Sequence, residues 1–135
     1  SGDGECVVVA GPRIDAATIP AQPGLRVLPY VHDLYEHLAA ADLGIVQGGL
    51  GTTMELAATR RPFLYFPLAD HCEQLFHVAH RLERHRAGRR MEYAATTPES
   101  LAEAALATLE SDTSRYRALD PQAAERAARA IAALL

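Results

Sequence analysis

Lysine is absent from this chain of 135 residues, and all 13 of its basic residues are arginines. Without a lysine there is no Schiff-base chemistry, no lysine general base and no Walker-A phosphate loop, because each of these needs an amine. Arginine still suits phosphate recognition, since its planar guanidinium donates hydrogen bonds in pairs. The sequence therefore excludes several mechanisms and keeps the means to bind anions.

The sequence also has few cysteines, no long apolar run and no excess of positive charge, and each of these features excludes a class of protein. The two cysteines, Cys6 and Cys72, lie far apart and form no CxxC pair, so we expect reduced thiols. No apolar run approaches the roughly 18 residues of a membrane span, and no signal peptide is recognisable. The formal net charge of −4 argues against a nucleic-acid-binding face. We expect a soluble, cytoplasmic protein without a nucleic-acid partner.

Alternating apolar runs and helical patterns predict an α/β fold. Continuous apolar runs without alternation are typical of parallel strands covered on both faces. The expected strands are residues 6–10, 26–31, 43–47 and 63–67, with a short last strand at 89–93. The expected helices are residues 33–41, 52–59, 72–86, one that begins at Thr97-Pro98, and one from about residue 121 to the end. The order predicts a doubly wound, Rossmann-like sheet with helices on both faces, whose ligands bind beyond the carboxyl ends of the strands.

A glycine-rich segment, residues 47–55, joins the third expected strand to its helix. Glycine lets backbone approach a ligand closely, and N–H groups at a helix N-terminus attract anions. We expect the N–H groups of Gly51, Thr52 and Thr53 to face an anion, the two threonine hydroxyls to add donors, and Glu55 to accept from ribose hydroxyls. The alternative is a glycine-rich turn in which threonine caps the helix and Glu55 stabilises its dipole. Spacing alone does not separate the two.

The loop after the fourth expected strand, residues 68–74, gathers acid, amide and imidazole groups that suit the binding of several hydroxyls. The alternative is an ordinary helix start capped by Asp70. His71, His77 and His80 lack the spacing of a zinc site, so we expect no metal. The arginines that follow are most simply a solvated face, with an acidic partner or a lipid-headgroup surface as the alternative; they are residues 81, 84, 86, 89 and 90.

Taken in order, residues 27–74 resemble the C-terminal domain of GT-B glycosyltransferases. The most similar group contains the bacterial peptidoglycan N-acetylglucosaminyltransferase and the UDP-glycosyltransferases. Its pattern is a strand and Ala-Ala-Ala-Asp, then His-Gly-Gly-x-Gly-Thr, a Glu, a Pro and an acid–Gln pair. Here the matching residues are 39–42, the glycine segment, Glu55, Pro62 and Glu73-Gln74. One departure is Gln47, which stands where many members have a phosphate-contacting histidine and which cannot carry a charge.

The resemblance implies roles for these residues. The backbone of Val31 would meet the base of a UDP-sugar, Glu55 would bind the ribose, and Glu73 and Gln74 would hold the hydroxyls of the sugar, with Asp70-His71 as the alternative register. The diphosphate would be cradled beside Gln47 by Gly48, Gly49, Gly51, Thr52 and Thr53. The resemblance implies no metal and no other cofactor. The catalytic residues are unknown, and we expect them on an N-terminal, acceptor-binding domain.

In that family the C-terminal domain begins one strand earlier than this chain does. Residues 1–135 would thus be a single nucleotide-sugar-binding domain truncated at its N-terminal side, and inactive alone. The acceptor domain would belong to the same polypeptide or to a partner chain. An unpaired strand edge near residues 7–9 or Ile45 predicts self-association by strand exchange.

The function expected on this basis is donor binding for a glycosyltransferase that transfers a hexosyl group to an unknown acceptor. The enzyme would be cytoplasmic, with a peripheral position at the inner face of the membrane as a further option. A non-hydrolysing sugar-nucleotide epimerase and a non-catalytic binding or assembly module remain alternatives.

Overall fold

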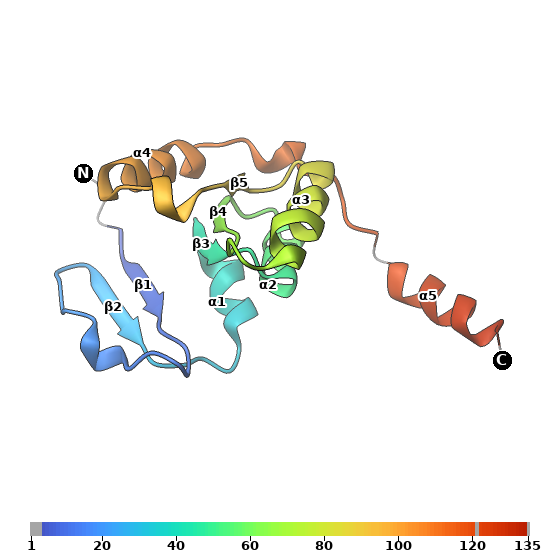
Figure 1. The fold of residues 1–135 in the computed structure, drawn as a ribbon, viewed down its shortest axis with the longest axis horizontal. Helices are drawn as coiled ribbons and strands as arrows, with labels where there is room; N and C mark the ends of the chain where they lie inside the picture. Colours follow the sequence, from blue (N-terminus) through green and yellow to red (C-terminus); the bar gives the residue numbers. More distant parts are fainter. Residues whose placement is uncertain (1–3, 121, 135) are drawn as a thin grey trace. The chain divides into compact units, whose positions relative to one another are not determined.

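The computed structural model describes residues 4–120 and 122–134 of the chain. It forms two compact units, one ending at Glu36 and the other beginning at His37, and each is described by itself. Parallel strands alternate with helices along the chain (Figure 1), which confirms the expected α/β class.

The first unit is built on a two-stranded parallel sheet. Strands β1 (Cys6–Val9) and β2 (Leu25–Leu28) pair in register, with Cys6 opposite Leu25. Between them lies the 3-10 turn η1 (Ala16–Thr18). Neither strand has a buried residue, so the expectation that both faces are covered is wrong for these two strands within the described chain. The predicted extension of β2 to Val31 is also wrong, because Pro29 follows and has no N–H for the ladder.

The second unit contains the larger sheet, which has the strand order β3-β4-β5 with both pairs parallel. Strand β3 (Gly44–Gln47) leads into helix α2 (Leu50–Ala58), and β4 (Phe63–Phe66) leads into the π-helical segment η2 (Glu73–Val78). Segment η2 continues as α3 (Ala79–His85), and β5 (Arg89–Arg90) follows. The predicted strand at 89–93 is therefore correct in place and too long.

The remaining elements are mainly helical. Helix α1 (Leu34–Ala40) precedes β3, and α4 (Pro98–Leu109) packs against β4. Helix α4 begins as predicted: Thr97 caps it, its Oγ1 accepts from the N–H of Ser100 at 3.1 Å, and Pro98 is its first residue. The short turns are η3 (Tyr93–Ala95) and η4 (Thr113–Arg115). Helix α5 (Ala123–Ala132) ends the chain, and the predicted start at residue 121 lies outside the described residues.

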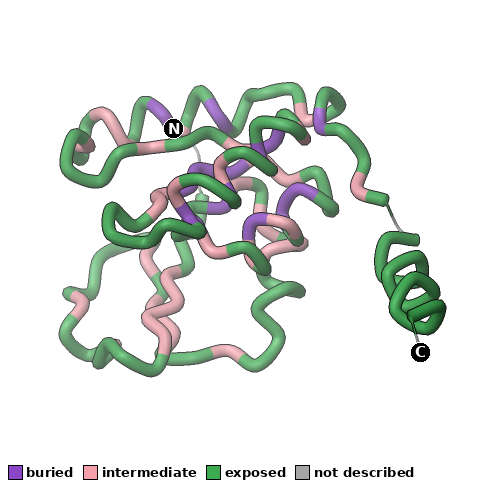
Figure 2. Tube along the Cα trace, turned by 45° about the vertical axis from the view of Figure 1, so that its right-hand side comes forward, coloured by how far each residue is buried: buried purple, intermediate pink, exposed green. Residues whose placement is uncertain are grey.

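The core of the second unit lies around β4. Buried positions gather on β4 and on the helices against it, whereas every described residue of α5 is exposed (Figure 2). The largest fully buried side chains are Phe63, Leu56, Leu64, Leu82, Val78 and Thr53. Strand β4 thus has the buried character that its apolar sequence predicts for a central parallel strand. Among the described residues, no helix is long and apolar enough to span a membrane.

Gly88 joins α3 to β5 at a point where no side chain fits. Its φ is +71°, and a Cβ there would lie 2.4 Å from Cε2 of Phe63. The hydroxyl of Tyr116 accepts a hydrogen bond from the N–H of Gly88 at 3.2 Å, and its ring meets Phe63 edge-on at 6.4 Å between centroids. Burial raises the pKa of the Tyr116 hydroxyl, because it disfavours the charged form. Gly88 therefore lets the chain close over the Phe63 ring.

We predict that Gly88→Ala lowers the free energy of unfolding by about 2–4 kcal/mol, since it adds a left-handed-backbone penalty to an overpacked core. Chemical denaturation measures the change. The matched control is Gly51→Ala inside α2, where a new Cβ meets nothing within 4 Å. That control should be neutral or stabilising by up to about 1 kcal/mol. Equal effects of the two substitutions would contradict this account of the Phe63 contact.

Candidate functional site

The pairing of β3 with β4 brings two loops to one edge of the sheet. Gln47, the last residue of β3, lies opposite Phe66, the last residue of β4. The loops that follow therefore begin side by side at the carboxyl edge, where ligands bind in open α/β sheets. Both loops were singled out from sequence, and the structure brings them together.

Gly48 is the residue at which the two loops touch. It is buried, and its N–H donates to the carbonyl oxygen of Phe66 at 3.1 Å, which extends the ladder beyond the strand. A Cβ on residue 48 would lie 2.9 Å from Cα of Pro67, and relieving this contact would require the backbone to move. The N–H of Gly48 therefore serves the sheet, and the role that the structure gives to Gly48 is close approach rather than donation to a ligand.

Gln74 holds the second loop from within. Its Oε1 accepts from the N–H of Leu68 at 2.9 Å, and the residue is only 7 % exposed. The same oxygen would be 3.4 Å from a Cβ at Gly48. Glu73, the preceding residue, is exposed. The acid–amide pair is thus divided: Glu73 remains available to a ligand, and the carbonyl oxygen of Gln74 is committed to the loop.

The first turn of α2 presents N–H groups without internal partners. Gly49 is the N-cap residue, with extended backbone and no side chain to cap the helix. The N–H of Thr53 donates to the carbonyl oxygen of Gly49 at 3.1 Å, so the helical ladder begins there. In the described part of the chain, no acceptor is found for the N–H groups of Gly49, Leu50, Gly51 and Thr52. These groups and the positive end of the helix dipole attract an anion.

Thr53 has a different role from the one expected. Its side chain is fully buried, and its hydroxyl donates to the carbonyl oxygen of Gly49 at 2.7 Å. Neither its hydroxyl nor its N–H is free for a ligand. The N–H groups that face an anion therefore belong to Gly49, which the resemblance had also named, to Gly51 and Thr52, which were expected, and to Leu50, which was not; the N–H of Thr53 is used within the fold. The side chain of Thr52 is partly exposed.

Two exposed polar side chains flank this turn. Gln47 is exposed at the end of β3, and Glu55 is exposed on α2. Glu55 comes four residues after Gly51 and three after Thr52, which puts it on the same face of the helix as those two residues. Among the described residues, the carboxylate of Glu55 joins no salt bridge. It is free to accept hydrogen bonds from a ligand bound at the helix start.

Val31 belongs to the other unit. It lies three residues beyond the end of β2 and is partly buried. The contact of its backbone with a base stays a prediction.

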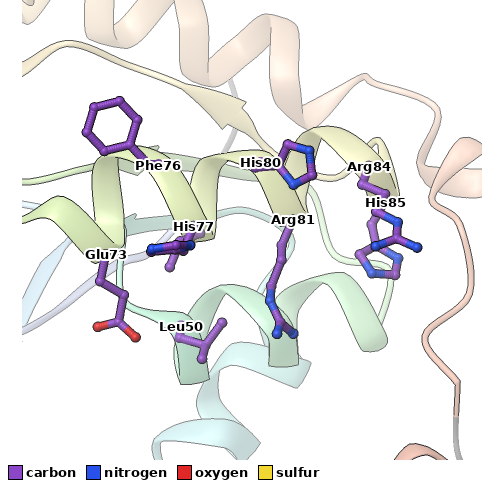
Figure 3. A pocket seen from close by; sticks show the side chains of 9 residues that line it. Leu50, Glu73, Phe76, His77, His80, Arg81, Arg84 and His85 are labelled. Atoms are coloured by element: carbon purple, nitrogen blue, oxygen red, sulfur yellow. The ribbon is translucent and has the colours of Figure 1, made fainter.

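A groove that the sequence did not reveal runs between the start of α2 and the helix formed by η2 and α3 (Figure 3). Leu50 and Glu73 line one end, and Arg81 and Arg84 line the other. The π-helical hydrogen bonding of η2 was also not predicted, since nothing in the apolar periodicity marks it. Such segments are rare and are frequent at functional sites.

We predict that Gln74→Ala leaves the N–H of Leu68 without its partner and lowers the free energy of unfolding by about 1–3 kcal/mol. Hydrogen exchange at the Leu68 amide should accelerate. The matched control is the neighbouring Glu73→Ala, which removes an exposed carboxylate and should change stability by less than about 0.5 kcal/mol. An unchanged Leu68 exchange rate in Gln74→Ala would show that the side chain does not hold the loop.

Three comparisons with known proteins show what this chain is similar to. Residues 8–134 match the model of the glycosyltransferase family 28 C-terminal domain. An Acidiphilium cryptum protein named UDP-N-acetylglucosamine--N-acetylmuramyl-(pentapeptide) pyrophosphoryl-undecaprenol N-acetylglucosamine transferase is 34 % identical over 121 residues, which are 90 % of this chain and 31 % of that protein. An uncharacterised glycosyltransferase of Methanopyrus kandleri is 32 % identical over 108 residues, 80 % of this chain and 31 % of that protein.

A solved structure, described as the glycotransferase of kitacinnamycin, has a similar fold, with a TM-score of 0.65 and 24 % identity over 93 % of this chain and 29 % of that one. The chain thus spans about a third of the length of these proteins. The chain belongs to the glycosyltransferase family 28 C-terminal domain family.

Proposed function

We propose that residues 1–135 together form one nucleotide-sugar-binding domain, the donor-binding part of a glycosyltransferase that transfers a hexosyl group from a UDP-sugar. The observation that carries the proposal is the row of N–H groups at the start of α2 that find no acceptor among the described residues and that lie at the carboxyl edge of the sheet, beside Gly48. A diphosphate supplies the charge that such a row attracts. The name of the Acidiphilium relative, which specifies UDP-N-acetylglucosamine, supports a UDP-linked donor.

In this proposal the chain acts on the leaving group. The N–H groups of residues 49–52 hold the diphosphate, and the dipole of α2 stabilises the negative charge that grows as the bond to the anomeric carbon breaks. Gln47 adds a neutral donor where a histidine would add a charge. Its contact with the diphosphate should therefore be weaker than that of a protonated imidazole.

The other expected site residues complete the donor site. The carboxylate of Glu55 accepts from the ribose hydroxyls, the backbone of Val31 meets the base, and Glu73 binds hydroxyls of the sugar. Gln74 positions the loop that carries Glu73. We assign acceptor binding and the catalytic base to a further domain, which would correspond to the remaining two thirds of a full-length relative. That domain would belong to the same polypeptide as this chain or to a partner chain.

The strand edges of the two sheets are a place where another strand could pair. In the described part of the chain, β1 pairs only with β2 and β3 pairs only with β4 at one edge. Val7 on β1 is 38 % exposed and Ile45 on β3 is 50 % exposed. We propose that another strand covers these edges, from the same polypeptide, a partner or a second copy of this chain.

Calorimetric titration with UDP tests the proposal. UDP should bind with a Kd at least about tenfold below that of uridine, since only UDP carries the anion. Glu55→Ala should weaken UDP binding by about tenfold, through the loss of charge-assisted hydrogen bonds worth about 1.5 kcal/mol. Glu103→Ala, an exposed glutamate on α4, is the matched control and should leave the Kd unchanged.

UDP binding no tighter than uridine binding would contradict a diphosphate site, and would favour the assembly-module alternative. UDP binding that Glu55→Ala does not weaken would contradict the ribose assignment. Product analysis on the full-length protein separates a transferase from an epimerase.

A further inference from the structure

The groove beside α2 is lined by more basic than acidic side chains. It encloses about 780 Å³, and its lining includes two arginines and three histidines but only one acid, Glu73, at the end near Leu50. In Figure 3 the side chain of Arg81 reaches from α3 toward α2, and Arg84 and His85 lie beyond it, away from Glu73. The end of the groove formed by Arg81 and Arg84 is therefore cationic and open.

Five arginines of the described chain are paired with a carboxylate, at positions 26, 90, 115, 126 and 129. The other eight form no salt bridge within the described residues, and two of these, Arg81 and Arg84, line the same groove without an acidic partner. Helix spacing explains this: the residues that precede Arg84 by three and four positions are Arg81 and His80. Like charges at this spacing destabilise a helix by a few tenths of a kcal/mol. An anion in the groove would relieve that repulsion.

Different elements supply the groups at the two ends of the groove. Leu50 and Glu73 line one end, and Arg81 and Arg84 line the other (Figure 3). A group bound by the two arginines would be held by side chains of α3, whereas the anion attracted by residues 49–52 would be held by backbone N–H groups of α2.

We propose that Arg81 and Arg84, with His77 and His80 beside them, form a second anion site that binds a phosphate group. Two planar guanidinium groups one helical turn apart match the paired oxygens of a phosphate. We leave His85 out of this site, because its Nδ1 lies 3.3 Å from the carbonyl oxygen of Arg117 and the residue therefore contributes to the fold. The phosphate belongs either to a soluble phosphate or diphosphate compound or to a phospholipid headgroup. The inference stands on this groove alone and does not depend on the donor proposal.

The test is an NMR titration of the chain with inorganic pyrophosphate at constant ionic strength. Signals of His77, His80, Arg81 and Arg84 should shift. The double variant Arg81→Gln/Arg84→Gln should weaken pyrophosphate binding at these residues by about tenfold or more. Both arginines are exposed, so an unchanged melting temperature should accompany the loss. Glu55→Ala should leave these shifts in place, which separates this site from the donor site.

The matched control is Arg126→Gln/Arg129→Gln on α5, which removes the same charge from arginines paired with Asp120 and Glu125. Pyrophosphate binding should change less than about twofold in this control. Equal weakening in both double variants would overturn the proposal, because net charge alone would then explain the binding. Shifts confined to residues 49–52 would overturn it as well.

Vesicles identify the source of the phosphate. Cosedimentation with phosphatidylglycerol vesicles, lost in Arg81→Gln/Arg84→Gln and absent with phosphatidylcholine, would identify a lipid headgroup. Groove-dependent pyrophosphate binding without cosedimentation would identify a soluble phosphate compound. The absence of both pyrophosphate binding and cosedimentation would reject the site.

Discussion

The close approach of Gly48 to Pro67 is the contact on which the candidate site depends. Parallel pairing brings the ends of β3 and β4 to the same edge, and the hydrogen bond from the N–H of Gly48 to the carbonyl oxygen of Phe66 carries the ladder one residue further. Only a residue without a Cβ fits without a shift of the backbone, because a Cβ on residue 48 would lie 2.9 Å from Cα of Pro67. This contact fixes where the loop after β3 turns, and hence where α2 begins and which way its first N–H groups face.

Around this contact, polar side chains that sequence comparison would assign to the ligand are used by the fold. Thr53 satisfies the carbonyl oxygen of Gly49, and Gln74 satisfies the N–H of Leu68. Both side chains are buried, where an unpaired polar group would cost about 1–3 kcal/mol. The polar groups of the candidate site therefore fall into two sets. The buried side chains of Thr53 and Gln74 hold the loops in place. The exposed carboxylates of Glu55 and Glu73 and the N–H groups of residues 49–52 remain accessible to a ligand.

Local rules predicted much of this arrangement from the sequence. The apolar run at β4, the glycine segment before α2 and the cap of α4 by Thr97 all depend on residues close in sequence, and the structure confirms them. Burial was less predictable, because it depends on what packs against a strand: β1 and β2 read as buried runs and have no buried residue in the described chain. The start of α2 was placed two residues late, since Gly51 suggested a loop although nothing obstructs a helix there.

The inward turn of Gln74 and the cationic groove were beyond the sequence. The π-helical geometry of η2 changes which side chains share a face, and no spacing of apolar residues in this stretch marks that change. The groove depends on the packing of α3 beside α2, which brings Arg81 toward a helix that precedes it by 23 to 31 residues in sequence. The family resemblance located the loops, and the hydrogen bonds of the folded chain decided which atoms in them are free.

Amide hydrogen exchange with and without UDP tests the central claim most directly, namely that residues 49–52 offer the free N–H groups of the site. Without UDP, the amides of Gly48 and Thr53 should exchange slowly, since both donate within the fold, and those of residues 49–52 should exchange fast. Saturating UDP should slow exchange at residues 49–52 selectively. Residues 49–52 that are already protected without UDP, or that gain no protection with it, would contradict the account.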